Sequence, residues 1–426
     1  MSTRTLALLG GDPVQQPAQD PHPTYSDKAM RRVTELLERG HTVGLNKNDA
    51  VVRETEEAIA RWQSAPHCLG TSSGHGALHA ALAGLEITGD DEVITTPYTW
   101  GASTGCILHN GAVPVFADVD PTTGLLDAAS VEAAVTPKTR AILAVHIFGQ
   151  AANMTAICEV AQRRGLKVIE DGSQAHGALH RGRKVGTFGD AAGFSCMGGK
   201  LLAATEAGYM VTRDANVYWR ASMACQHMGR SPEPGFPDEL RPFADSLVYT
   251  YRLATVNAVL LTEQLQKLDD EIAGRRQNAD AFRAGLSGVG SVALPEYTDG
   301  DAPSYHMLTM NFDPEHAGVS RSTYSAALKA EGVSAGPYVP SPISQWARLD
   351  PDSGGPRNMW DDAIRRSGRV LADTELPNCE HKIARSLEMG WNYILPDSTR
   401  IGRVADAFHK VEDNLSTLRD HEAASA

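Results

Sequence analysis

The sequence predicts an α/β protein with a large domain built on a mostly parallel sheet and a smaller C-terminal α+β domain. Three observations predict this fold. The chain has 426 residues, which is too long for one small core. Between residues 67 and 213, short apolar stretches alternate with amphipathic ones, as strands and helices do in a parallel sheet covered on both faces. After about residue 289 this alternation stops.

The N-terminal part should form an arm and two helices. The first 25 residues are rich in Pro, Gly and Gln, which predicts an extended arm. Ser26 or Asp27 can cap a helix that ends at Gly40, and residues 44–49 should form a loop before a second amphipathic helix. The apolar face of the first helix is expected to carry Met30, Val33, Leu36 and Leu37.

The remaining elements follow from the periodicity of apolar residues. Strands of the large domain are expected at 92–95, 113–117, 141–145, 167–170, 193–196 and 208–212. Helices are expected at 77–85, 102–109, 128–135 and 154–164, with one long helix from 256 past 270. The second domain should contain a strand at 305–312, a helix at 322–331, a Pro-rich loop at 337–342 and a terminal helix at 401–418. We therefore divide the chain into an arm and helix (1–45), a large domain (46–285) and a small domain (286–426).

Composition excludes several classes of function. The formal net charge is −13, whereas nucleic-acid binding requires clustered Lys and Arg. No apolar run reaches the roughly 20 residues that span a bilayer, and the apolar stretch at the N-terminus is too short for a secretory signal. The six cysteines are scattered, without a CxxC pair or metal-ligand spacing. These features predict a cytoplasmic enzyme that binds neither nucleic acid, nor membrane, nor metal.

Asp171 lies at the end of an apolar stretch and is followed by small residues. A carboxylate there is costly to bury unless it meets a cation or hydrogen-bond donors. One suitable cation is a protonated pyridine nitrogen, which lets a cofactor ring accept electrons. The alternative is an aspartate that only caps the next turn.

Lys200 follows a strand that ends near Ser195, about thirty residues after Asp171. Gly198 and Gly199 would let the backbone turn tightly before the lysine. A lysine in a half-buried cleft loses its charge readily, and its neutral amine forms Schiff bases. Ser195 could donate to a phosphate. The alternative is a surface lysine at the start of a loop.

Two further strand ends carry small or aromatic residues. Residues 70–78 read GTSSGHGAL, a turn that opens a helix, whose free N–H groups and dipole suit a phosphate. Residues 95–103 place Trp100 at a helix start, where an indole can stack on an aromatic ring. The alternative for residues 70–78 is an ordinary connection between a strand and a helix. The alternative for Trp100 is a tryptophan packed in the core.

Together these segments resemble the DegT-type (StrS-like) sugar aminotransferases, which are fold-type-I enzymes that depend on pyridoxal 5′-phosphate. The resemblance spans most of the chain and implies a seven-stranded sheet in the large domain. It is carried by LLGGDPV at 8–14, SGHGALH at 73–79, DVD at 118–120, HIFGQ at 146–150, DGSQAHG at 171–177, FSCMGGK at 194–200 and LPNCE at 376–380.

The resemblance implies roles for individual residues. Lys200 would bind the cofactor covalently and move the proton, and Asp171 would pair with the pyridine nitrogen. Trp100 would stack on the ring, and Gln174 would lie near its 3-hydroxyl. The phosphate would be held by Gly74, His75 and Ser195.

In the resembling family an asparagine reaches the phosphate from the neighbouring subunit, which implies a homodimer with two shared active sites. Here Thr250 stands at that position and donates only one hydrogen bond. His75 stands where the family commonly has threonine, so its phosphate contact would come from the backbone.

Transamination is the function that the resemblance implies, with an amino acid as donor and a keto-sugar or keto-cyclitol as acceptor in natural-product biosynthesis. The altered residues around the cofactor keep a second hypothesis open. It is elimination, γ-replacement or carbon–carbon bond formation on an amino acid such as S-adenosylmethionine. A regulatory sensor is a third hypothesis, but the sequence shows no basic helix-turn-helix as an output module.

The second substrate is expected to be polyol-like or larger rather than a simple α-keto acid. A dicarboxylate site usually sets two arginines for bidentate recognition. Only Arg252 is a candidate near the site, and Arg230 has no clear place. The loop 336–342 offers Tyr338 and hydroxyl groups, which suit a polyol.

Overall fold

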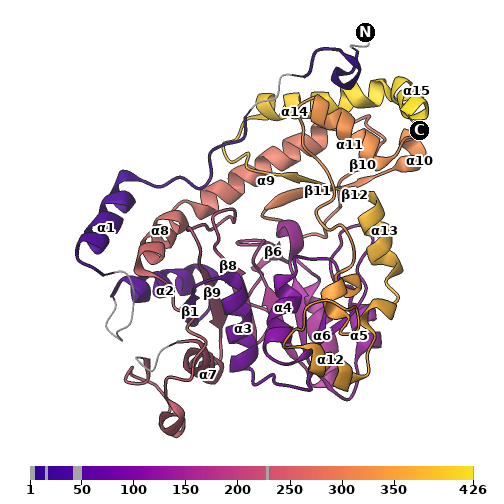
Figure 1. Cartoon of the computed structure of the whole chain (residues 1–426). Coiled ribbons are helices and arrows are strands. Elements are labelled where there is room, and N and C mark those ends of the chain that lie inside the picture. Colours follow the sequence, from indigo (N-terminus) through magenta and orange to yellow (C-terminus); the bar gives the residue numbers. More distant parts are fainter. Residues whose placement is uncertain (1–4, 15–17, 42–49, 227–229, 426) are drawn as a thin grey trace.

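The computed structural model describes residues 5–14, 18–41, 50–226 and 230–425. In these residues the chain forms a seven-stranded sheet, in the lower half of Figure 1, and a three-stranded sheet above it. This confirms the predicted α/β class, the mostly parallel large sheet and the smaller C-terminal sheet. Within the described ranges, no helix is both long and apolar enough to cross a membrane.

The large sheet has the strand order β1-β9-β8-β5-β4-β2-β3. Strand β9 runs antiparallel to both of its neighbours, and every other pair of adjacent strands is parallel. The carboxyl ends of β2, β4, β5 and β8 therefore meet at one edge of the sheet, where ligands bind in such folds. The strands are β1 (His67–Thr71), β2 (Glu92–Thr95), β3 (Val113–Phe116), β4 (Thr139–Val145), β5 (Lys167–Asp171), β8 (Ala191–Ser195) and β9 (Gly208–Thr212).

Helices cover both faces of this sheet. Along β9, Met210 packs in a core cluster with α3, α4 and α7, whereas Tyr209 and Val211 pack in another with α2 and α8. This alternation follows from the two-residue period of a strand. The covering helices are α2 (Ala50–Gln63), α3 (Gly74–Gly84), α4 (Ala102–His109), α5 (Ala128–Ala134), α6 (Met154–Arg164), α7 (Ala215–Cys225) and α8 (Thr255–Leu265).

The small sheet is antiparallel, with β11 (Met307–Phe312) between β10 (Val292–Ala293) and β12 (Ser386–Gly390). Its core includes the fully buried Phe282, Trp391 and Phe408. A hairpin, β6 (Leu179–His180) with β7 (Arg183–Lys184), lies outside both sheets. The remaining helices are α9 (Leu268–Gly285), α10 (Pro314–Ala317), α11 (Arg321–Ala330), α12 (Asp361–Ser367), α13 (Pro377–Arg385), α14 (Ser398–Asp413) and α15 (Leu415–Ser425).

The N-terminal arm runs along the small domain before it reaches α1 (Asp27–Glu38) (Figure 1). The arm is not wholly extended, because a 3₁₀ turn forms at Ala7–Leu9. The preceding Leu6 anchors the arm, since its side chain is buried in the small-domain core. Ser26 caps α1 as expected, by accepting a hydrogen bond from Ala29 N at 3.2 Å. The expected loop at 44–49 lies outside the described residues.

The predicted apolar face of α1 is partly wrong. Met30 and Leu37 are 52% and 54% exposed, whereas Leu36 is buried and packs beside Ala29 and Val259 of α8. α1 therefore contacts α8 over a narrower face than its four apolar residues predicted. Burial on a partner helix, not hydrophobicity alone, decides which side faces inward.

Two helices that were predicted to be continuous are each divided. The first ends at Leu265 (α8) and restarts at Leu268 (α9), where the first turn carries three acidic residues that favour a helix N-terminus. The second divides at Asn414, whose side chain donates to Lys410 O at 2.8 Å and competes with the backbone ladder.

Candidate active site

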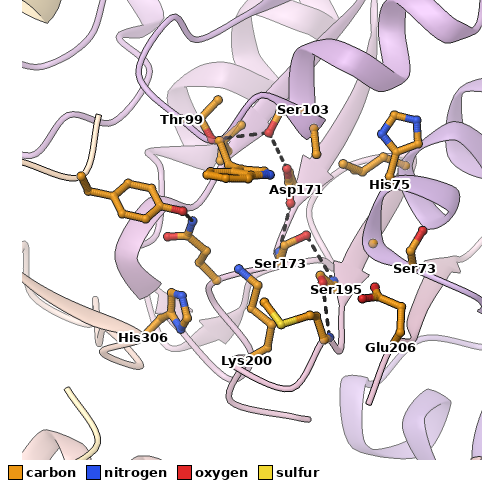
Figure 2. A pocket seen from close by; sticks show the side chains of 18 residues that line it. Ser73, His75, Thr99, Ser103, Asp171, Ser173, Ser195, Lys200, Glu206 and His306 are labelled. Atoms are coloured by element: carbon orange, nitrogen blue, oxygen red, sulfur yellow. Dashed lines mark hydrogen bonds between the residues drawn. The ribbon is translucent and has the colours of Figure 1, made fainter. Parts of the chain in front are cut away.

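The strand ends of the large sheet surround a cavity of about 500 Å³. Figure 2 shows side chains from several elements pointing into it. All residues that the sequence assigned to the cofactor line this cavity, with the exception of Thr250. They are Gly74, His75, Trp100, Asp171, Gln174, Ser195 and Lys200.

Asp171 is the last residue of β5, at the middle of the sheet, and is 5% exposed. Its Oδ2 accepts a hydrogen bond from Ser103 Oγ at 2.7 Å, and its Oδ1 accepts one from Ser173 N at 3.0 Å (Figure 2). Within the described part of the chain it has no ion-pair partner. A buried carboxylate with two donors and no cation leaves room for a positively charged ligand atom.

Sequence reasoning missed Ser103 and Ser173, which orient this carboxylate. Ser103 lies on α4, three residues after Trp100, and therefore on the same side of the helix start. Ser173 also accepts a hydrogen bond from Ser195 N at 3.2 Å, so it ties the ends of β5 and β8 together. The available signal for Ser173 was a small hydroxyl residue two positions after the end of β5, whereas Ser103 lies inside α4 and had no such signal.

Lys200 faces Asp171 across the cavity (Figure 2). Burial lowers its pKa, while the charge of Asp171 acts in the opposite direction. Its Nζ has no hydrogen-bond partner among the described residues. The buried Lys382 differs, because its Nζ donates to three oxygens, the nearest being Asn311 Oδ1 at 2.7 Å. The amine of Lys200 is therefore free to react.

The backbone before Lys200 turns as expected, but the glycines are not the reason. Lys200 N donates to Met197 O at 2.8 Å and closes the turn. Neither Gly198 nor Gly199 has a positive φ, and a Cβ on either would make only ordinary contacts. From the N-terminal arm, His22 Nε2 donates to Lys200 O at 2.8 Å and holds the turn from outside.

Three other residues of the lining come from separate parts of the chain. His306, next to β11, enters from the small domain, and its pKa lies well below the usual value because of burial and the nearby Lys200. Glu206 precedes β9, and burial raises its pKa. Tyr338 comes from the predicted loop 336–342. The sequence analysis assigned neither His306 nor Glu206 to the site. Glu206 follows Lys200 by six residues, whereas no local pattern connects His306 with Lys200.

The turn before α3 lies directly on the end of β8. A Cβ at Gly74 would sit 2.4 Å from Ser195 Cβ, so only glycine allows this approach. Ser73 caps the helix by accepting from Gly76 N at 3.1 Å. The N–H groups of Gly74 and His75 have no carbonyl of their own helix to bond, which leaves them for an anion.

The side chain of His75 turns away from this turn. Its Nε2 shares a hydrogen bond of 2.8 Å with His109 Nδ1 on α4. Burial, together with His109 and His79, lowers the pKa of His75 to about 4. A neutral imidazole bound in this way leaves only the backbone of His75 for a phosphate.

Trp100 and Gln174 form the far side of the cavity. The indole of Trp100 is 65% exposed, so one face is free to stack on a ring. Gln174 Oε1 accepts from Phe148 N at 2.8 Å, and its Nε2 donates to Tyr338 Oη at 3.3 Å. The amide thereby connects the large domain with the loop that carries Tyr338.

Thr250 lies outside this chain's cavity, on an exposed segment where it adopts a φ of 59°. The next residue, Tyr251, packs beside α3, where its Oη shares a hydrogen bond of 3.1 Å with His79 Nδ1. Arg230 does not reach the cavity, because it forms an ion pair of 2.6 Å with Glu56. Arg252 is not part of the lining either.

The donors of the cavity fit pyridoxal 5′-phosphate. The free N–H groups at the start of α3 suit a phosphate, and the unpaired Asp171 suits a protonated ring nitrogen. Lys200 supplies an amine that no described residue bonds, and Trp100 supplies an exposed indole face. Among the residues that the structure describes, no group of three or more His, Cys, Asp or Glu side chains could hold a metal ion.

Comparisons with known proteins agree with this fit. The model of the DegT/DnrJ/EryC1/StrS aminotransferase family matches residues 24–371. The chain is 34% identical to an L-glutamine:2-deoxy-scyllo-inosose aminotransferase of Streptomyces lividus over 427 residues, which cover 96% of this chain and 97% of that protein. It is 31% identical to an L-glutamine:scyllo-inosose aminotransferase of Streptomyces griseus over 419 residues, covering 96% and 98%. The crystal structure of DesI, determined in the presence of its TDP-sugar product, superposes with a TM-score of 0.78 at 27% identity, covering 99% and 98%.

Proposed function

Because the chain belongs to the DegT/DnrJ/EryC1/StrS aminotransferase family, we propose that it uses pyridoxal 5′-phosphate to transfer an amino group from L-glutamine to a keto-cyclitol. The reaction would belong to the biosynthesis of an aminocyclitol natural product. The names of the relatives support both substrates, since each names L-glutamine as donor and an inosose as acceptor. These relatives also favour transamination over replacement chemistry.

One observation carries the proposal: the amine of Lys200 and the carboxylate of Asp171 face the same cavity from opposite sides. The pyridoxal ring, when bound, withdraws electrons from the carbon that carries the amino group. Asp171 would hold the positive charge on the ring nitrogen, and its own position is held by Ser103 and Ser173. Gly74 and His75 would bind the phosphate through their backbone N–H groups.

Lys200 would hold the cofactor covalently and then move the proton at the substrate carbon. Burial lowers its pKa, which favours the neutral amine that this transfer requires. Tyr338 and His306 would cover the cavity from the small-domain side and restrict the entry of water. Among the described residues, the lining holds no pair of arginines of the kind that binds both carboxylates of a dicarboxylate.

The test is a two-step reaction of the purified holoenzyme. L-glutamine alone should change the absorbance of the bound cofactor, and scyllo-inosose should then restore it, with one aminocyclitol formed per cofactor by mass spectrometry. A matched reaction with 2-oxoglutarate as acceptor serves as the specificity control. Formation of an eliminated or alkylated amino acid without any aminocyclitol would contradict the proposal.

We also propose a homodimer in which each protomer completes the other's active site. Exposed apolar side chains surround Thr250: Phe243, Leu247 and Tyr249 are 67%, 88% and 52% exposed. An apolar segment of this kind suits burial against a second copy. Thr250 would then donate to the phosphate in the neighbour's cavity.

Mixed dimers test the shared site. Lys200→Ala and Thr250→Glu should each abolish turnover as homodimers. In a dimer that combines the two, one site carries both substitutions and the other carries neither, so activity should return on mixing after subunit exchange. Because half of the dimers at random exchange are mixed and each has one intact site, about a quarter of the wild-type activity is expected. No recovery in a verified mixed dimer would contradict sharing.

We also propose that the protein is cytoplasmic, because its cysteines form no disulfides. All six are free thiols, and five of them are buried. Free thiols of this kind are typical of a reducing compartment.

A further inference from the structure

A second cavity, of about 420 Å³, lies beside the cofactor cavity. The two share His75, Trp100 and Ala102, so these residues form a common wall. The chemistry proposed above uses only the first cavity. A volume of this size is within the range of sites for small ligands.

Indole rings form much of the second cavity. Besides Trp100, it is lined by Trp346 and Trp360, which come from the segment between β11 and α12. Trp346 is 37% exposed and packs on Gly101, where a Cβ would sit 2.7 Å from the ring. Trp360 is fixed more firmly, because its Nε1 donates to Arg348 O at 3.0 Å.

The polar groups in this cavity have unused hydrogen-bonding capacity. Thr104 is 2% exposed, and its Oγ1 has no hydrogen-bond partner in the part of the chain that the structure describes. An orphaned buried hydroxyl is uncommon, because it forfeits the bond that it made with water. His109 uses Nδ1 for His75, which leaves its Nε2 free for a ligand. Arg348 lies at the edge, 4.9 Å from the Trp360 ring centroid.

We propose that this cavity is a second acceptor subsite that binds an uncharged, sugar-like ring joined to the keto-cyclitol. The proposal rests on the proposed function and extends it: the acceptor would be a glycosylated cyclitol, so amination would follow a glycosyl transfer. The keto-cyclitol would lie at Lys200, and the attached ring would reach the second cavity past the exposed indole of Trp100.

The chemistry of the walls selects this class of ligand. The axial C–H bonds on a face of a sugar ring carry slight positive charge, which suits the negative face of an indole. Thr104 and His109 would bond the hydroxyl groups at the ring's edge. None of the described residues that line the cavity is an aspartate or glutamate, and Arg348 adds a positive charge, so an aminated, cationic ring would be repelled.

Binding of unreactive alcohols to the holoenzyme tests the subsite without requiring turnover. The probes are scyllo-inositol and its O-glucosyl derivative, titrated by calorimetry. The glucosyl derivative should bind about tenfold more tightly, the effect of one well-placed stacking contact. Equal affinity of the two probes for the wild-type holoenzyme would overturn the proposal, and so would tighter binding of benzoate, an anionic ring.

Two substitutions locate the effect. Trp346→Ala should remove most of the tenfold preference, and Thr104→Val, which is close to isosteric, should remove about threefold. Neither should change the affinity for scyllo-inositol itself. Met359→Ala is the control, because Met359 is 74% exposed and does not line the cavity. A preference that persists in both subsite variants would also overturn the proposal.

The outcomes separate this inference from the function on which it rests. If scyllo-inosose is aminated but the glucosyl group gives no gain in affinity, the enzyme is a transaminase without the second subsite. If the glucosyl probe binds tightly but no keto-cyclitol is aminated, the binding site stands and the proposed reaction is wrong.

Discussion

Two neighbouring carboxylates at the end of β5 have opposite environments. Glu170 is fully buried, and its oxygens accept hydrogen bonds from three backbone N–H groups and from His146 Nε2. Asp171 is also buried, but accepts from one hydroxyl and one backbone N–H and faces the cavity. Adjacent residues of a strand point to opposite faces, so one carboxylate is enclosed by protein and the other faces the ligand site.

This difference indicates that Glu170 stabilises the fold, whereas Asp171 serves the ligand site. Burial raises the pKa of Glu170, but the hydrogen bond and charge of His146 and the N–H groups of Gly189 and Gly186 outweigh it and leave the pKa lowered. The enclosed carboxylate has all its partners in the chain. The carboxylate at the cavity has no ion-pair partner among the described residues, so a positively charged ligand atom can supply one.

The largest expected effect is on the cavity side, at Lys200. Lys200→Ala should lower turnover by at least ~10⁴-fold, since it removes both the covalent attachment and the proton transfer. Borohydride reduction of the wild-type holoenzyme, followed by peptide mass spectrometry, should find the cofactor on Lys200 alone. Lys382 is the matched control: burial lowers its pKa to about 8, yet its amine is fully bonded. Labelling of Lys382 would show that acidity, not access to the cavity, selects the lysine.

Asp171→Asn should be next in size. The amide is nearly isosteric and keeps an acceptor for Ser103 or Ser173, but it loses the charge that the ring nitrogen needs. Turnover should fall about a thousandfold, while the urea midpoint of the cofactor-free protein stays close to wild type. Steady-state kinetics and unfolding curves measure the two effects. Near-normal turnover would contradict the proposed role.

Glu170→Gln should show the reverse pattern. Each oxygen of Glu170 accepts two hydrogen bonds, so an amide NH₂ group must face at least one backbone donor. The variant should be destabilised by about 2–4 kcal/mol in urea unfolding. The protein that remains folded should retain turnover within about threefold, because Glu170 does not line the cavity. A large loss of turnover without a loss of stability would show that Glu170, like Asp171, acts in the reaction rather than in the fold.

A smaller effect is expected from His75, on the cavity side. Burial and the neighbouring His109 and His79 lower its pKa to about 4, from 6.5 in the unfolded chain. Between these values the unfolded chain binds a proton that the folded chain does not, so stability falls as pH drops from about 6.5 to about 4. His75→Asn removes this contribution, and its urea midpoint should fall less over that range than the wild-type midpoint. Parallel midpoint curves would show that His75 does not cause the loss.

Much of the large domain and of the candidate site followed from local pattern. Short stretches centred on apolar residues marked β2, β5 and β8. They placed Asp171 at a strand end and Lys200 in the turn that follows another. Parallel strands end at the same edge, so residues far apart in sequence were expected in one site. The structure places them there, in one cavity.

The sequence by itself determined the α/β class, the positions of most strands along the chain and the candidates for the cofactor site, because those depend on periodicity and short segments. Only the tertiary structure decided which additional residues join them, namely Ser103, Ser173, Glu206 and His306. It also turned His75 toward His109 and revealed the cavity that Trp100 shares with Trp346. The physical reason is that side-chain direction and cavity shape depend on packing between segments that are distant in the chain, and no local pattern records that packing.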